Sequence, residues 1–284
     1  MDESPSARDQ GTHVQVNGLR KYYEAHGEGI PLILLHGGLE NCQMWAPAIP
    51  SLSKSYQVFT PDTRGHGRTD NPSGQFSYPV LAEDMAHFID ALGLQNPLVA
   101  GYSDGGETAL HMAMLYPGLA RGYMVGGVFN TMTAAWRQVM QGLLGFEGPG
   151  IVDFERVIRT NAEFILSLEE KHDVFQGPGY WKSLLTQASR AWWEPPVHTR
   201  ADLAKITDPV LFWCGDRDVF CPPEQSLEMY RMVDKAELAL IPNADHLAIA
   251  AQWDVANTIL LSFMKRVTGP KSEPPCPPNA RPHN

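Results

Sequence analysis

The chain has 284 residues, of which 43% are hydrophobic and 19% charged, and these proportions exclude both wholesale disorder and a fibrous repeat. Its 32 acidic side chains outnumber the 22 basic ones, which gives a formal net charge of -10. That balance argues against nucleic acid or an anionic membrane as the main partner, because both are bound through clustered lysine and arginine.

The cysteines and the N-terminus indicate a reducing compartment. Four cysteines are too few for a disulfide scaffold and too widely spaced for a zinc site, so we expect reduced thiols at Cys42, Cys214, Cys221 and Cys276. Residues 1–11 are polar where a signal peptide needs an apolar stretch. We therefore expect a cytoplasmic protein with a disordered N-terminal segment; its oligomeric state is open.

The first ordered element is predicted to be a β-hairpin over residues 13–24. Apolar and polar side chains alternate there around Asn17-Gly18, which is a strong two-residue turn signal. Short apolar runs, separated by amphipathic stretches such as residues 80–92, then predict buried parallel strands joined by helices. These runs are residues 31–35, 56–60, 97–100, 123–125, 209–214 and 238–241. The predicted fold is a mostly parallel sheet with an antiparallel N-terminal hairpin and helices on both faces.

Residues 128–208 interrupt this alternation and are far longer than an ordinary loop of about 4 to 6 residues. Helical periodicity within them predicts a helical lid, inserted after the sixth strand of a core made of residues 12–127 and 209–267. The predicted lid helices are residues 134–144, 152–171 and 179–193. The aromatic side chains of the lid could line a pocket for an acyl or aryl group of modest size. The alternative is that they form the core of the lid itself. We expect the proline-rich residues 268–284 to be disordered.

A candidate nucleophile lies where the strand predicted at 97–100 ends. Residues 101–105 match Gly-x-Ser-x-Gly and run directly into a helical pattern. A serine in that setting sits on a tight, strained turn, and its hydroxyl projects above the carboxyl edge of the sheet. We therefore predict that Ser103 is the nucleophile, since an ordinary glycine-rich turn explains the setting less well.

A serine needs a base and an acid, which follow it in chain order in strand-turn-helix hydrolases. Of the downstream histidines, His198 precedes the last strands and His283 is in the tail, so we predict His246 as the base. The acid is predicted to be Asp218, which follows the strand at 209–214; Asp216 is the alternative.

The tetrahedral intermediate of acyl transfer requires N–H donors for its oxyanion. We predict one donor at Asp104, directly after the nucleophile, and the second at Gly38, in the loop after the strand at 31–35. We expect His36 and His66 to hold loops rather than to react.

Together these motifs resemble the α/β-hydrolase superfamily over roughly residues 12–266. The resemblance is carried by residues 35–38, 62–69, 101–106, 215–218 and 245–246. It implies the α/β-hydrolase fold, with Ser103, Asp218 and His246 as nucleophile, acid and base. Ser103 differs from the residue at this turn in haloalkane dehalogenases and epoxide hydrolases, which have an aspartate as nucleophile there.

Within the superfamily, residues 103–106 are most similar to the nucleophile turn of valacyclovir hydrolase (biphenyl hydrolase-like) proteins. That resemblance implies that the Asp104 carboxylate helps to bind the ammonium of an amino acyl ester. The alternative is that an acid in the first turn of a helix only complements the helix dipole.

The sequence thus predicts a serine hydrolase that cleaves a small carboxylic ester or lactone through an acyl-enzyme, without a metal or organic cofactor. The same three residues could instead serve an acyltransferase, a C–C bond hydrolase, an amidase or a perhydrolase. A ligand receptor with slow turnover is a further alternative. The expected partner is a small-molecule substrate, with no nucleic acid or membrane.

Overall fold

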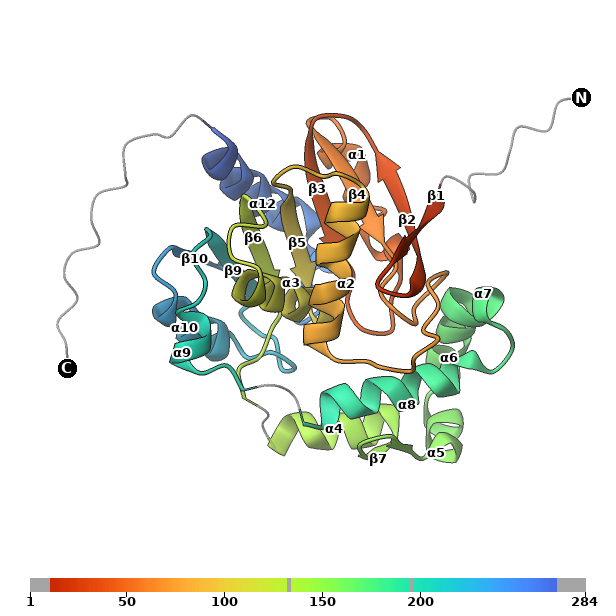
Figure 1. Ribbon diagram of the computed structural model, residues 1–284. Coiled ribbons are helices and arrows are strands. Elements are labelled where there is room, and N and C mark those ends of the chain that lie inside the picture. Colours follow the sequence, from red (N-terminus) through yellow and green to blue (C-terminus); the bar gives the residue numbers. More distant parts are fainter. Residues whose placement is uncertain (1–10, 132–133, 195–196, 270–284) are drawn as a thin grey trace, which may run out of the picture.

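A computed structural model describes residues 11–131, 134–194 and 197–269. Eight strands form one sheet in the order β1-β2-β4-β3-β5-β6-β9-β10, in which β1 and β2 are antiparallel to their neighbours and the others run parallel (Figure 1). The strands are β1 Gly11–Val16, β2 Leu19–His26, β3 Ile30–Leu35, β4 Tyr56–Pro61, β5 Leu98–Tyr102, β6 Gly122–Gly126, β9 Val210–Gly215 and β10 Ala236–Ile241. The predicted mostly parallel sheet with an antiparallel start is confirmed.

The hairpin forms where the turn signal placed it. Asn17 and Gly18 have φ angles of 44° and 75°, as a two-residue turn between strands of right-handed twist requires. The first strand begins at Gly11, one residue inside the N-terminal segment that we expected to be disordered, and residues 1–10 lie outside the described part of the chain.

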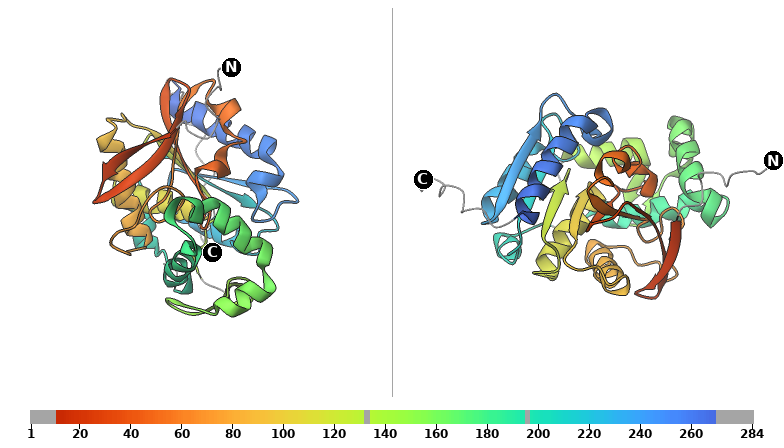
Figure 2. Two further views of the ribbon diagram at one scale, coloured as in Figure 1. Left: turned by 90° about the vertical axis from the view of Figure 1, so that its right-hand side faces the viewer. Right: turned by 90° about the horizontal axis from the view of Figure 1, so that it is seen from above.

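Helices cover the two faces of the sheet and bury a separate apolar core on each (Figure 2). One face is covered by α2 Tyr78–Ala91, α3 Asp104–Leu115 and α10 Pro223–Met232. The other is covered by α1 Ile49–Leu52 and α12 Trp253–Thr268. The last helix includes the first residue of the predicted tail, and residues 270–284 lie outside the described residues. No helix of the described segments is long and apolar enough to cross a membrane.

The segment between β6 and β9, called here the inserted segment (residues 128–208), packs against the carboxyl end of the sheet (Figure 1). Its apolar core includes Leu39, Phe129 and Cys221, which follow β3, β6 and β9. The segment contains α4 Ala134–Leu144, β7 Phe146–Gly148, β8 Ile151–Val152, α5 Phe154–Thr160, α6 Ala162–Leu168, the π-helical turn η2 Glu169–Asp173, α7 Val174–Gln176, α8 Tyr180–Trp193 and α9 Arg200–Leu203. Two short helices, η1 Cys42–Trp45 and α11 Ala248–Ala251, lie in loops of the core.

The prediction of one helix over residues 152–171 is wrong. The Asp153 side chain accepts a hydrogen bond from the Arg156 N–H and so starts α5 one residue after a strand. Asn161 then separates α5 from α6, because its backbone is not helical at φ -139° and ψ 51° and its side chain donates to the Leu143 carbonyl oxygen. The periodicity of apolar residues continues across Asp153 and Asn161, so it does not mark either point.

Candidate active site

Ser103 occupies the turn between β5 and α3 in a strained backbone conformation, with φ 55° and ψ -122°. The surrounding glycines permit this turn. A Cβ atom on Gly101 would lie 2.0 Å from the Gly105 carbonyl oxygen, and one on Gly105 would lie 2.1 Å from the Leu35 carbonyl oxygen. Any larger residue would push the helix away from the sheet, so the local sequence places the serine at the sheet's carboxyl edge.

The structure brings Ser103, His246 and Asp218 together from three separate loops. His246 Nε2 lies 3.1 Å from Ser103 Oγ, and His246 Nδ1 lies 2.7 Å from Asp218 Oδ2. Because the carboxylate accepts at Nδ1, that nitrogen carries the imidazole proton and Nε2 presents its lone pair to the hydroxyl. In this arrangement the imidazole can remove a proton from the serine.

Asp218 is held rigidly for this contact. Its side chain is fully buried, and its second oxygen, Oδ1, accepts hydrogen bonds from the N–H groups of Phe220 and Cys221. Asp216, the alternative acid, instead accepts from the Ala244 N–H and so joins the loops that follow β9 and β10. The geometry therefore supports Asp218, and gives Asp216 a role in shaping the loop.

The two residues predicted to supply oxyanion donors lie beside each other and beside the serine. A Cβ atom on Gly38 would lie 2.7 Å from Asp104 Oδ2, and one on Gly37 would lie 3.4 Å from Ser103 Cβ. The Asp104 N–H begins α3, where no preceding turn supplies a carbonyl to accept its hydrogen bond. Both backbone donors can therefore be directed at a tetrahedral intermediate on Ser103.

The Asp104 carboxylate already makes hydrogen bonds to other side chains of the protein. It accepts hydrogen bonds from the Tyr78 hydroxyl at 2.7 Å and from Trp192 Nε1 at 2.9 and 3.0 Å, and the residue is only 6% exposed. Burial raises the pKa of the Asp104 carboxyl to about 7, although both hydrogen bonds oppose the shift. Trp192 comes from the inserted segment, and nothing in its local sequence distinguishes it from the other tryptophans there.

A hollow of about 290 Å³ opens above the serine. Ser103 and His246 line it together with Gly37 and Gly38, and the rest of the lining comes from Glu40, Met44, Tyr102, Leu247 and Ala250. Its size is at the lower end for small-molecule sites, so it suits a short group. A larger, polar hollow of about 700 Å³ lies between residues 70–74 and α8 and does not include the serine.

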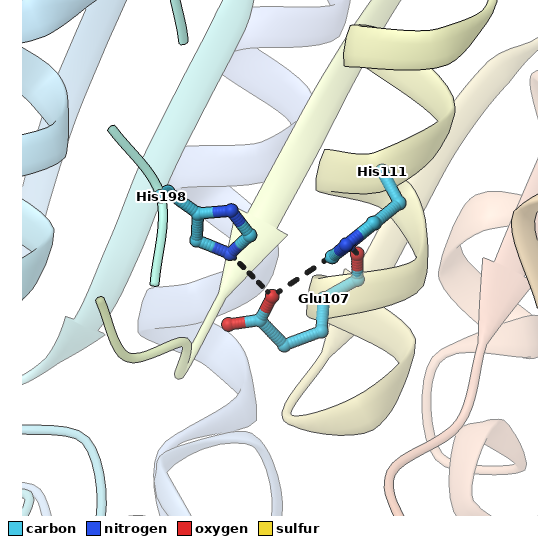
Figure 3. A group of neighbouring side chains, drawn as sticks. All are labelled: Glu107, His111 and His198. Carbon is cyan, nitrogen blue, oxygen red and sulfur yellow. Dashed lines mark hydrogen bonds and ion pairs between the residues drawn. The ribbon is translucent and has the colours of Figure 1, made fainter. Parts of the chain in front are cut away.

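Two groups of side chains in the described segments could hold a metal ion. One is Asp218, Cys221 and His246, which overlaps the arrangement just described. The other is the buried group Glu107, His111 and His198 (Figure 3). His198 Nε2 lies 3.0 Å from Glu107 Oε2, and His111 Nδ1 lies 2.9 Å from the Glu107 carbonyl oxygen. Hydrogen bonds account for the second group without a metal.

The second group joins α3 to both ends of the inserted segment. Glu107 Oε1 accepts from the Phe129 N–H, where the chain leaves the core, and Glu107 Oε2 bonds to His198, where it returns. His198, one of the downstream histidines of the sequence, therefore pairs with Glu107 and not with the serine.

Comparison with known proteins identifies the fold. A family model described as "alpha/beta hydrolase fold" matches residues 30–148. The putative carbamate hydrolase RutD of Azorhizobium caulinodans is 28% identical over 255 residues, which cover 85% of this chain and 94% of that protein.

Two solved structures superimpose over most of the chain. The meta-cleavage product hydrolase CumD of Pseudomonas fluorescens IP01 has a TM-score of 0.72 at 24% identity, with 90% of this chain and 98% of that one covered. The enol-lactonase of Burkholderia xenovorans LB400 has a TM-score of 0.70 at 20% identity, with 89% and 99% covered. The chain thus has the α/β-hydrolase fold, as its sequence motifs predicted.

Proposed function

We propose that this chain, which has the α/β-hydrolase fold, is a serine hydrolase that cleaves a small carboxylic ester or lactone. The observation that carries the proposal is the pair of contacts that links Ser103 Oγ through His246 to Asp218, at 3.1 and 2.7 Å. The similar proteins include an enol-lactonase and a putative carbamate hydrolase. Their names are consistent with the proposed cleavage of a bond to an acyl carbon.

The proposed reaction has two halves. Ser103 Oγ attacks the substrate carbonyl while its proton passes to His246 Nε2, and the oxyanion is bound by the N–H groups of Gly38 and Asp104. The C–O bond then breaks, the leaving alcohol takes the proton from His246, and an ester of Ser103 is left. Water attacks that ester with His246 again as base, which releases the acid and restores the serine.

The volume of the hollow at Ser103 predicts a preference for short acyl groups. With about 290 Å³ available, kcat/KM should be highest for p-nitrophenyl acetate to butyrate and fall about tenfold or more by decanoate. Steady-state rates on this ester series, with γ-lactones and aryl carbamates alongside, would measure it. Flat or rising values with chain length would show that this hollow does not limit the length of the acyl group.

A covalent probe tests the mechanism itself. A fluorophosphonate should add to Ser103, and intact-mass spectra should show one adduct that disappears in Ser103→Ala. If no adduct forms under conditions that inactivate a control esterase, the acyl-enzyme mechanism fails. Product analysis with added amines, alcohols or peroxide would separate hydrolysis from acyl transfer and perhydrolysis.

The Asp104 side chain is proposed to dock the inserted segment rather than to bind a substrate ammonium. Both its oxygens already accept hydrogen bonds from Tyr78 or Trp192. The ratio of kcat/KM for an alanyl ester to that for the matching propionyl ester should therefore change less than about threefold in Asp104→Asn. A loss of tenfold or more in that ratio would instead assign ammonium binding to Asp104, as the resemblance to valacyclovir hydrolase implies.

A further inference from the structure

The loop that carries Gly38 rests on three buried histidines from three different segments. His36 follows β3, His66 lies in the loop after β4, and His172 belongs to η2 in the inserted segment. Their rings form a row, with centroid distances of 5.3 Å from His36 to His66 and 5.6 Å from His66 to His172. All three are 1% exposed or less.

Each ring holds one peptide unit of the loop. His36 Nδ1 lies 2.8 Å from the Gly37 carbonyl oxygen, the Leu39 N–H donates to His66 Nε2 at 3.2 Å, and His172 Nε2 lies 3.1 Å from the Leu39 carbonyl oxygen. These backbone groups belong to three consecutive peptide units, 37–38, 38–39 and 39–40. The first unit includes the Gly38 N–H, the predicted oxyanion donor.

The remaining ring nitrogens fix the tautomers. The Thr63 N–H donates to His36 Nε2 at 2.9 Å, the Gly67 N–H donates to His172 Nδ1 at 2.9 Å, and His66 Nδ1 lies 3.0 Å from the Arg64 carbonyl oxygen. A nitrogen that accepts from an N–H must carry a lone pair, and one that faces a carbonyl must carry a proton. Each ring is therefore neutral, with one donor and one acceptor in use.

Leu39 needs these contacts. Its φ angle is 61°, a left-handed conformation that is uncommon for a residue with a branched side chain and persists only where the surroundings enforce it. His66 bonds its N–H and His172 bonds its carbonyl. The conformation of the residue after Gly38 is thus held from both sides, once from the core and once from the inserted segment.

We infer that His172 is a positioning residue for the Gly38 oxyanion donor, so that the inserted segment completes the catalytic geometry through its contact with Leu39. This inference rests on the proposed function. Donors that are oriented beforehand stabilise the transition state more than the bound substrate, because the negative charge develops only during the reaction. The loss of His172 should therefore lower kcat and leave KM nearly unchanged.

Variants at two positions of the inserted segment test this. His172→Leu removes the donor to Leu39 and should lower kcat about 10- to 100-fold, with KM within about twofold of the wild type. His172→Gln keeps a donor and an acceptor in one planar group and should recover most of that loss. The matched control is Gln176→Leu, because Gln176 donates to the carbonyls of Gly67 and Thr69 and makes no hydrogen bond to the oxyanion loop.

Equal losses of kcat in His172→Leu and Gln176→Leu would overturn the inference, because docking of the inserted segment in general would then explain both. Hydrogen–deuterium exchange supplies a readout that does not depend on activity. The peptide that contains Leu39 should exchange faster in His172→Leu but not in Gln176→Leu, and unchanged exchange would also overturn the inference. If the wild type hydrolyses no ester, the proposed function fails, while the exchange result still decides whether His172 holds the loop.

Discussion

Replacing Ser103 by alanine is expected to lower kcat on a short p-nitrophenyl ester by about a million-fold, with KM little changed. Without the hydroxyl no acyl-enzyme can form, and only the oxyanion donors and substrate binding are left to act on a water molecule. Single-turnover rates at high enzyme concentration would measure the residual activity. His246→Ala should lose about as much, and the double variant should lose no more than either single one, because the two side chains act as a unit.

The acid gives a graded comparison within the same experiment. Asp218→Asn should lower kcat about 10⁴-fold, because an amide at that position favours the wrong tautomer of His246. Asp216→Asn makes the same chemical change two residues away, where the side chain accepts only from the Ala244 N–H. It should stay within about threefold of the wild type. If the two variants exchanged these effects, Asp216 would be the acid.

The proximity of Ser103, His246 and Asp218 could be predicted because its signals are local. The strained turn at Ser103 needs a small residue two positions before the serine and another two positions after it. Gly101 and Gly105 therefore mark the turn in the sequence. His246 and Asp218 directly follow predicted strands, and parallel strands end at one edge of a sheet. Short apolar runs similarly predicted the sheet, since the central strands β5, β6 and β9 are buried on both faces.

The contributions of the inserted segment could not be predicted, because they are long-range. Trp192 reaches Asp104 across 88 residues and His172 reaches Leu39 across 133 residues. Nothing next to either residue in the sequence indicates these contacts. The π-helical turn that carries His172 also escapes periodicity, which assumes an unbroken α-helix. A histidine in a helical pattern therefore reads as an ordinary surface or core residue.

Three contacts of the inserted segment converge on the loops and the helix around Ser103. Trp192 donates to the Asp104 carboxylate directly after Ser103, His172 bonds to Leu39 in the loop that carries Gly38, and His198 bonds to Glu107 on α3. The inserted segment therefore helps to hold the residues around Ser103 in place. Substitutions at Trp192, His172 and His198 should therefore change catalytic rates.

The buried histidines also predict how stability depends on pH, and His172 offers the cleanest measurement. Burial lowers the pKa of His172 from 6.5 to about 4 in the folded protein, although its hydrogen bond to Leu39 opposes the shift. Between those values the unfolded chain binds a proton that the folded chain does not, so stability falls as pH falls from 6.5 towards 4. One such group lowers the free energy of unfolding by about 3 kcal/mol over this pH range. Below the range its contribution no longer changes with pH.

His172→Gln removes the group that binds this proton. The free energy of unfolding of the variant, relative to that of the wild type, should therefore rise by about 3 kcal/mol between pH 7 and pH 4. Urea unfolding at pH steps across that range, followed by far-UV circular dichroism, would measure the difference. Using a difference cancels the opposite contribution of Asp104, whose raised pKa makes the folded state bind an extra proton in the same range. His87→Gln, on the exposed face of α2, is the control for replacing a histidine by glutamine away from the row of rings. Parallel pH curves for wild type and His172→Gln would mean that the imidazole of His172 titrates alike in both states, and that the row of neutral rings beneath the oxyanion loop does not persist in solution.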